Sequence, residues 1–125
     1  MLTYILRSLN SGNIHFKKLC NLHEIGSIRG RIKDNTCYII NINIIDLENR
    51  RKKHGSELIN IFETVVKHNY NINEIRLSAW ENTHQSMYIS KFYLHNKYIK
   101  SPNEESSYYD DSVNIFKITN FMKKL

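Results

Sequence analysis

Residues 38–59 read YIININIIDLENRRKKHGSELI, and this stretch decides the fold. It opens with a nearly continuous β-branched run, which predicts a strand over residues 38–45 that is buried on both faces and central in its sheet. A turn with basic residues at 50–53 follows, and an amphipathic helix begins at Ser56. Backbone N–H groups at a helix start and the positive end of the helix dipole bind anions, so the stretch predicts a phosphate-binding site.

Two asparagines interrupt the predicted strand. Because strand side chains alternate between faces, the spacing places Asn41 and Asn43 on the same face as Ile39 and Ile45. Amides on a buried face need partners, which can be each other, neighbouring backbone or a ligand.

Length and composition predict an ordinary globular protein. The 125 residues suffice for one core, so we expect residues 1–125 to form a single domain. No apolar run is long enough to span a membrane and no signal-peptide pattern is present, which predicts a cytoplasmic protein without a membrane partner, in the host cytoplasm if the chain is viral. Cys20 and Cys37 lack the spacing of a zinc site or a disulfide framework, so no metal is expected.

The formal net charge of +6 raises the possibility of a nucleic-acid-binding domain. However, the basic residues are spread along the chain, with one tight cluster at residues 50–53. No recognition helix, zinc finger or RNA-binding aromatic signature accompanies them. Nucleic acid is therefore the least favoured partner.

Hydrophobic periodicity predicts the remaining elements. Further strands are predicted at residues 3–9, 14–22, 25–33, 74–80 and 112–121, and helices at residues 56–68 and 85–97. Residues 14–22 also fit one or two helical turns, but a strand is favoured. Asp34-Asn35 predicts a hairpin turn, and residues 101–111 predict a polar turn region. The strand, helix and strand around residues 56–68 imply a right-handed parallel crossover.

Two segments resemble the GCN5-related N-acetyltransferases (GNAT). Residues 45–59 are similar to that family's acetyl-CoA signature, in which an apolar strand, a short acidic turn, an Arg/Gln-x-x-Gly-x-Gly/Ala loop and a leucine-containing helix follow one another. Residues 92–98, FYLHNKY, are similar to the Phe-Tyr-x-x-x-Gly-Phe end of the family's next helix. Asn82 falls near a frequent asparagine of the family. The resemblance covers about residues 38–121.

The resemblance implies an α/β (α+β) fold with a mixed, mostly antiparallel central sheet flanked by helices. A strand-helix-strand unit would form the acetyl-CoA-binding core. The helix pair that the family places between its first two strands is absent here or reduced to a turn, so the chain would be a compact member.

The resemblance also implies that acetyl-CoA is the cosubstrate. The coenzyme A pyrophosphate would lie on the loop and helix start, and the pantetheine arm on the preceding strand edge. The implied coenzyme A-binding residues are Asn43, Ile44, Ile45, Arg50, Arg51, Lys52, Lys53, His54, Gly55, Ser56 and Asn82. Tyr93 would protonate the departing thiolate as a general acid, while an amine attacks the acetyl carbonyl directly.

Two residues depart from the family pattern. Lys53 stands at the first glycine of the loop. Its side chain there crowds the pyrophosphate, demands an unusual backbone angle or adds a cation to the pyrophosphate, and these three alternatives stay open. Asn41 stands where many members carry a glutamate and cannot take a proton. The general base is therefore unassigned, with Glu81 and His84 as catalytic candidates and Asp46 as a third.

Three function classes remain open. The favoured class is an N-acetyltransferase that acts on a protein lysine, an N-terminus or a small amine. The second is a degenerate relative that keeps the fold and acts through coenzyme A binding or protein contacts. The third is a basic nucleic-acid-binding domain. A short N-terminal half favours an open acceptor site suited to a protein lysine, and both a monomer and a homodimer fit the sequence.

Overall fold

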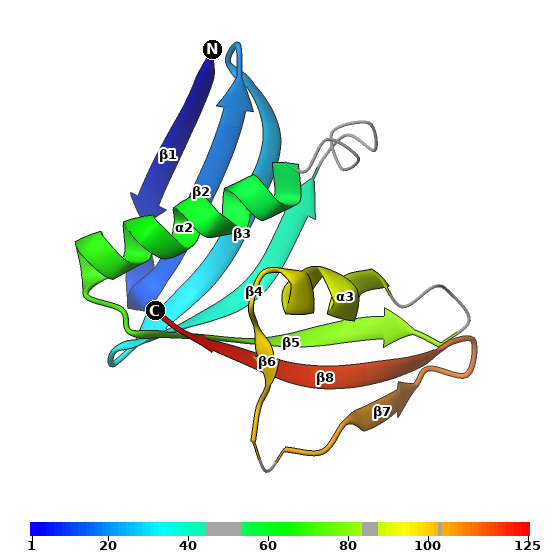
Figure 1. Cartoon of the computed structure of the whole chain (residues 1–125). Coiled ribbons are helices and arrows are strands. Elements are labelled where there is room, and N and C mark those ends of the chain that lie inside the picture. The colour runs from blue at the N-terminus through cyan, green and yellow to red at the C-terminus, as the bar shows by residue number, and fades with distance from the viewer. Residues whose placement is uncertain (45–53, 84–87, 103) are drawn as a thin grey trace. The chain divides into compact units, whose positions relative to one another are not determined.

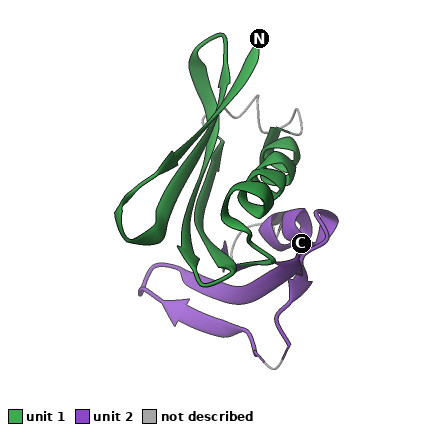
Figure 2. Cartoon of the chain, turned by 90° about the vertical axis from the view of Figure 1, so that its left-hand side faces the viewer, with its two compact units in different colours: residues 1–75, 125 green, residues 76–124 purple. Residues whose placement is uncertain are grey.

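The computed structural model describes residues 1–44, 54–83, 88–102 and 104–125. The chain divides into two compact units, which are coloured separately in Figure 2. Unit 1 comprises residues 1–75 and Leu125, and unit 2 comprises residues 76–124.

Unit 1 is an antiparallel sheet with a helix on one face (Figure 1). Its elements are β1 (Leu2–Ser8), β2 (Asn13–Cys20), β3 (His23–Lys33), β4 (Thr36–Ile44) and α2 (His54–Tyr70). Each of these strands pairs antiparallel with the next along the chain. The apolar stripe of α2 packs on the alternating apolar side chains of the sheet, as in the Phe16–Phe62 ring contact at 5.7 Å. The strand prediction for residues 14–22 is confirmed.

A single short turn joins β1 to β2. It is the 3-10 turn η1, Asn10–Gly12. At this place the resemblance puts a pair of helices, so the expectation that those helices are reduced to a turn is confirmed.

The prediction that the strand at residues 38–45 is buried on both faces is wrong. Tyr38 is 42% exposed and Ile40 is 64% exposed. One face of β4 is open, because α2 covers the other face of this sheet. The β-branched Ile40 is therefore exposed, although the run in which it stands predicts burial.

The predicted face of the asparagines is also wrong, because β4 contains a bulge. Asn41 lies opposite Arg29 while Ile39 lies opposite Gly30, which leaves Ile40 as an extra residue. The extra residue inverts the alternation, so Ile39 is buried whereas Asn41 is exposed.

The strands that flank α2 begin side by side in unit 1. The backbone N–H of Asn73, just before β5 (Glu74–Asn82), donates to the carbonyl of Asn35, just before β4, at 3.0 Å. The N–H of Leu125 donates to the Asn73 carbonyl at 2.9 Å. This arrangement is the one expected of the predicted parallel crossover.

Unit 2 holds most of β5 together with the C-terminal elements. These are α3 (Tyr88–His95), β6 (Ile99–Lys100), β7 (Ser107–Asp110) and β8 (Ile115–Lys124). β8 lies beside β5 and pairs antiparallel with both β6 and β7. The polar turn predicted at residues 101–111 is wrong for residues 107–110, since an edge strand with exposed side chains lacks the apolar alternation that would reveal it.

The described residues bear on three features: membrane spans, metal sites and cysteines. Neither α2 nor α3, as described, has the length and apolarity that crossing a membrane requires. The described residues contain no cluster of His, Cys, Asp or Glu able to hold a metal ion. Both cysteines are free, and burial raises the pKa of the Cys37 thiol to about 12.

Gly12 tests the importance of the η1 turn. Its φ is +77°, and an added Cβ would lie 2.5 Å from the Ile32 carbonyl oxygen. We expect Gly12→Ala to lower the free energy of unfolding by about 2–3 kcal/mol, measured by urea denaturation. The control is Ser11→Gly in the same turn: Ser11 has a φ of 62°, so glycine removes strain there. A Gly12→Ala protein as stable as the wild type would show that the η1 turn accepts a side chain at residue 12.

Candidate functional site

The start of α2 is the candidate phosphate-binding end of the chain. The helix begins at His54, so the predicted residues His54, Gly55 and Ser56 form its first turn, and all three are partly exposed. The first N–H groups of a helix have no partner within it, and a helix of 17 residues adds a dipole with its positive end here. The predicted residues Ile45, Asp46 and 50–53 lie outside the described residues.

A buried lysine lies under this first turn. Lys18 of β2 is 0% exposed, and its ammonium donates to Glu57 Oε2 at 2.8 Å and to His54 Nδ1 at 3.1 Å. An ammonium only donates, so Nδ1 accepts and the ring proton of His54 lies on Nε2. The Tyr4 ring adds a cation–π contact at 5.8 Å. Lys18 thus fixes the start of α2 on the sheet.

The lysine also changes the electrostatics of the helix start. Glu57 is the acidic residue of the first turn, and its side chain is 54% exposed. The hydrogen bond and the charge of Lys18 lower the pKa of Glu57, which keeps the carboxylate ionised. A free carboxylate at this place would repel a phosphate, and the paired ammonium offsets that repulsion.

The end of β4 packs closely on β3 and α2 in unit 1. Asn43 lies opposite Ser27 and is exposed, while Ile44 lies opposite Gly26 and is buried. A Cβ at Gly26 would lie 2.9 Å from Ile44 Cδ1 and 3.2 Å from a methyl group of Leu58. Glycine therefore allows the helix start and the end of β4 to pack on the same point of β3.

The candidate general acid lies in an aromatic cluster of unit 2. Tyr93 of α3 is 8% exposed, and its ring lies 5.7 Å from the rings of both Tyr98 and Phe121. Phe92 contacts it edge-on at 5.2 Å. Burial raises the pKa of Tyr93 to about 12, so the phenol keeps its proton at neutral pH.

Glu81, a candidate base, is held by α3. Its side chain is 2% exposed and accepts hydrogen bonds from the Ser90 backbone N–H, at 3.2 Å, and from the Ser90 hydroxyl. These bonds join the end of β5 to the first turn of α3 and so orient the helix that carries Tyr93. His84 lies outside the described residues.

Asn82, predicted to bind coenzyme A, joins two strands of unit 2. Its amide donates to Asn114 Oδ1 at 2.8 Å, and the neighbouring Thr83 hydroxyl donates to the Ile115 carbonyl at 3.0 Å. Both bonds connect the end of β5 to the beginning of β8.

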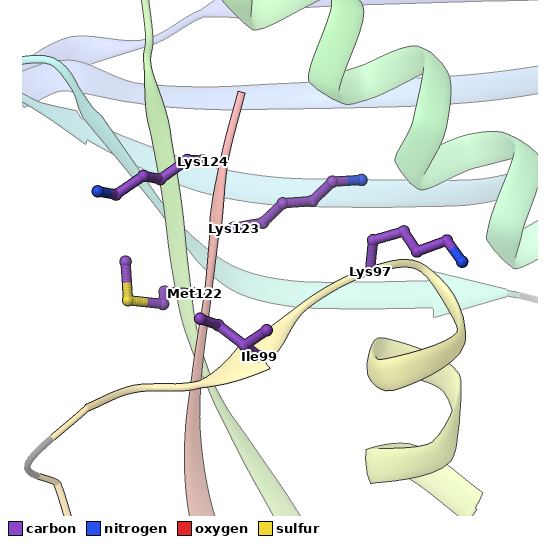
Figure 3. A pocket seen from close by; sticks show the side chains of 5 residues that line it. All are labelled: Lys97, Ile99, Met122, Lys123 and Lys124. Atoms are coloured by element: carbon purple, nitrogen blue, oxygen red, sulfur yellow. The ribbon is translucent and has the colours of Figure 1, made fainter.

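Unit 2 also contains a pocket of about 310 Å³ that holds none of the predicted site residues. It is lined by Lys97, Ile99, Met122, Lys123 and Lys124, which Figure 3 shows around β6 and the end of β8. The Lys123 ammonium donates to the Asn96 carbonyl at 2.9 Å and lies 5.5 Å from the centre of the Tyr98 ring. A lysine that caps the carbonyls after α3 has a structural role.

Sequence reasoning missed two residues that organise the site. Lys18 occupies the α2-facing position that follows Ile14 and Phe16, so a charged residue within an apolar alternation was the available signal. Ser90 gave no signal, because its role depends on a carboxylate nine residues earlier on another element.

Solved acetyltransferase structures are similar to this chain over nearly its whole length. A Bacillus subtilis acetyltransferase in complex with CoA has a TM-score of 0.72 and 11% identity, with 100% of this chain and 99% of that chain covered. A GNAT family acetyltransferase from Elizabethkingia anophelis with acetyl-CoA bound has a TM-score of 0.70 and 11% identity, with 99% and 98% covered. This chain has the GNAT fold.

A third similar structure is longer than this chain. It is a Bacillus anthracis protein assigned as a streptothricin acetyltransferase, in complex with acetyl coenzyme A, with a TM-score of 0.72 and 20% identity. The match covers 94% of this chain and 66% of that protein, so the chain spans slightly less than two thirds of its length. No protein-family model and no curated protein matches the chain.

The GNAT fold confirms the predicted fold class. The chain has a mixed, mostly antiparallel sheet with flanking helices and a reduced N-terminal half. The candidate residues of the GNAT fold fall in both units: those on β4 and α2 belong to unit 1, and those on β5 and α3 belong to unit 2.

Because Lys18 is buried and Glu57 is half exposed, we expect substitutions of these two residues to change the stability by different amounts. Glu57→Gln leaves the buried ammonium of Lys18 without its carboxylate, so we expect the free energy of unfolding to fall by about 1–3 kcal/mol. Because Glu57 is half exposed and water screens the pair, the loss should lie near the lower end of that range. Lys18→Met supplies an apolar chain and leaves Glu57 in water, with an expected change below about 1 kcal/mol. Urea denaturation at pH 7 measures both variants.

The same pair predicts a pH dependence. The folded-state pKa of Glu57 is lowered, so its contribution to stability is fully present above the ordinary value of 4.5 and is lost as the pH falls through the folded pKa. The wild type should lose this contribution in that window, and Lys18→Met should lack it. Equal costs for Glu57→Gln and Lys18→Met, or identical pH profiles for wild type and Lys18→Met, would contradict the assignment.

Proposed function

We propose that this chain is an acetyl-CoA-dependent N-acetyltransferase. The observation that carries the proposal is the GNAT fold itself, shared over the whole chain with structures that contain CoA or acetyl-CoA. The start of α2 and Tyr93, which stands where the resemblance puts the general acid, are the two local features that support it.

The start of α2 holds the pyrophosphate of coenzyme A in this proposal. The first-turn N–H groups of His54, Gly55 and Ser56 are the donors, and Lys18 offsets the charge of the first-turn glutamate. The donor set fits the ligand, because it provides backbone N–H groups, a dipole and a glycine. Asn43, Ile44 and Ile45 provide the strand edge for the pantetheine amides, the basic residues Arg50, Arg51, Lys52 and Lys53 add positive charge, and Asn82 completes the set.

Tyr93 is the general acid of the proposed reaction. Acetyl-CoA supplies an activated acetyl group as a thioester, and the transfer forms a C–N bond to the amine and breaks the C–S bond. The leaving thiolate needs a proton, which the phenol of Tyr93 carries at every pH below about 12.

A base must take the proton that the amine releases. Asn41 is exposed on β4 and an amide cannot accept that proton. Glu81 is a carboxylate, although Ser90 already occupies part of its hydrogen-bonding capacity, and His84 has the better-matched intrinsic pKa. We propose these two residues as the candidates, with Glu81 also positioning α3.

The acceptor is proposed to be an amine on a protein or peptide. The η1 turn takes the place of the helix pair expected between β1 and β2, so unit 1 has few residues with which to enclose a small molecule. An open acceptor side suits the lysine or N-terminus of a larger partner.

Tyr93→Phe tests the acid role. We expect kcat for thiol release from acetyl-CoA, with a lysine-containing peptide as acceptor, to fall about 100-fold while the affinity for acetyl-CoA stays unchanged. Tyr98→Phe is the matched control, because it removes a phenol hydroxyl from the same aromatic cluster. It should keep the wild-type kcat, and equal turnover in Tyr93→Phe and the wild type would rule out the role of Tyr93.

The degenerate alternative makes a different prediction. A chain that binds coenzyme A without catalysis is stabilised by acetyl-CoA, by about 2.7 kcal/mol at 100 times the Kd, yet releases no thiol with any amine. Thermal denaturation with and without acetyl-CoA, run beside the thiol assay, separates binding from turnover.

A further inference from the structure

The sheet face of unit 1 that points away from α2 is strongly basic. Ile14, Phe16 and Ile28 are buried, and the Phe16 ring contacts the Phe62 ring of α2, so alternation places the neighbours of these residues along β2 and β3 on the face that points away from α2. No helix among the described residues of unit 1 covers that face (Figure 2). The basic face, as we name it, consists of Arg7, His15, Lys17, Arg29, Arg31 and Lys33.

Strand register brings basic and polar side chains into one row across this face. Arg7 of β1 pairs with His15 of β2, His15 pairs with Arg29 of β3, and Arg29 pairs with Asn41 of β4. Arg7 and Arg29 thus flank His15, and neighbouring strands lie close enough for one extended anion to reach both guanidinium groups.

The charge of the basic face is only slightly neutralised within residues 1–44, all of which the structure describes. Lys17 pairs with Glu24 at 3.5 Å, and the register shift between Lys18 and Leu19 places Glu24 opposite Leu19 on this face of the strands. Partial burial lowers the pKa of His15, Arg29, Lys17 and Arg7 lower it further, and Glu24 opposes them. Burial thus acts together with the cations on β1, β2 and β3 to disfavour a charge on His15.

We propose that the basic face binds a single-stranded nucleic acid through its phosphates. Arg29 and Arg31 project from alternate positions of β3 and give a row of cations along the strand as well as across it. Tyr38 lies opposite Arg31 with 42% of its surface exposed, and so offers a ring on which a base can stack. The exposed amide of Asn41 adds hydrogen-bonding capacity beside Arg29.

The basic face gathers residues that lie far apart in the sequence. The basic residues are spread along the chain, which argued against a nucleic-acid partner, but the sheet collects those of three strands on one face. An acidic protein would satisfy the charge, whereas the combination with an exposed tyrosine and an amide favours a nucleic acid. The proposal goes beyond the acetyltransferase function and does not depend on it.

The test is fluorescence anisotropy with a labelled oligouridine of about 20 nucleotides over a series of salt concentrations. We expect saturable binding by the wild type and an affinity about tenfold weaker in Arg29→Gln/Arg31→Gln. The slope of log K against log salt should decrease by about 1.4, which is about 0.7 for each lost phosphate contact. If the first variant does not fold, Arg7→Gln/Lys33→Gln replaces it in the test, and this second variant should also weaken binding.

The matched control is Lys67→Gln/Lys91→Gln, which removes two exposed lysines from α2 and α3 and gives the same change in net charge. It should bind the oligonucleotide as the wild type does. Equal weakening in the control would overturn the proposal, because net charge alone would then explain binding. Displacement by polyglutamate of equal length at equal concentration would also overturn it, in favour of an acidic protein partner.

Two further readouts separate this site from the acetyltransferase site. The affinity of Arg29→Gln/Arg31→Gln for acetyl-CoA should equal that of the wild type, so the two proposals can fail independently. The pKa of His15, followed by NMR, should rise when the oligonucleotide binds, since phosphates offset the surrounding cations. An unchanged pKa with bound oligonucleotide would place the nucleic acid elsewhere and overturn the proposal.

Discussion

The ammonium of Lys18, buried beneath the first turn of α2, is the interaction on which the position of this helix in unit 1 depends. A buried charge is stable only when it is paired, so the pair with Glu57 and the bond to His54 fix where the helix starts on the sheet. The first N–H groups of a helix have no partner within the helix and lie at the positive end of its dipole, while Lys18 offsets the charge of the glutamate that would weaken an anion site. Packing and proposed phosphate binding thus have one cause.

The short connection between β1 and β2 is the second constraint. A tight η1 turn keeps β1 to β4 as one continuous antiparallel arrangement and adds no helix there. α2 then covers one face, and the other face stays open with its row of arginines and His15. The same shortening accounts for the open acceptor side and for the nucleic-acid-binding basic face, both of which are proposals.

The fold was largely predictable from the sequence, and the errors have local physical causes. Alternation and helical spacing located β1 to β3, β5, α2 and β8, because half-buried elements carry a period in their side chains, whereas a β-branched run located β4. The bulge at Ile40 leaves no mark in a β-branched run, so the faces of Asn41 and Asn43 were misassigned. β7 was missed because an exposed edge strand has a polar sequence. Tyr93 was identified by resemblance, whereas Ser90 required the folded geometry.

A calorimetric titration of the chain with acetyl-CoA and with S-acetylpantetheine tests the central claim most directly. S-acetylpantetheine keeps the thioester and the pantetheine amides but lacks the nucleotide and its pyrophosphate. The account predicts saturable binding of one acetyl-CoA per chain and much weaker binding of S-acetylpantetheine, because the start of α2 holds the pyrophosphate. No saturable binding of acetyl-CoA, or equal affinities for the two compounds, would contradict it.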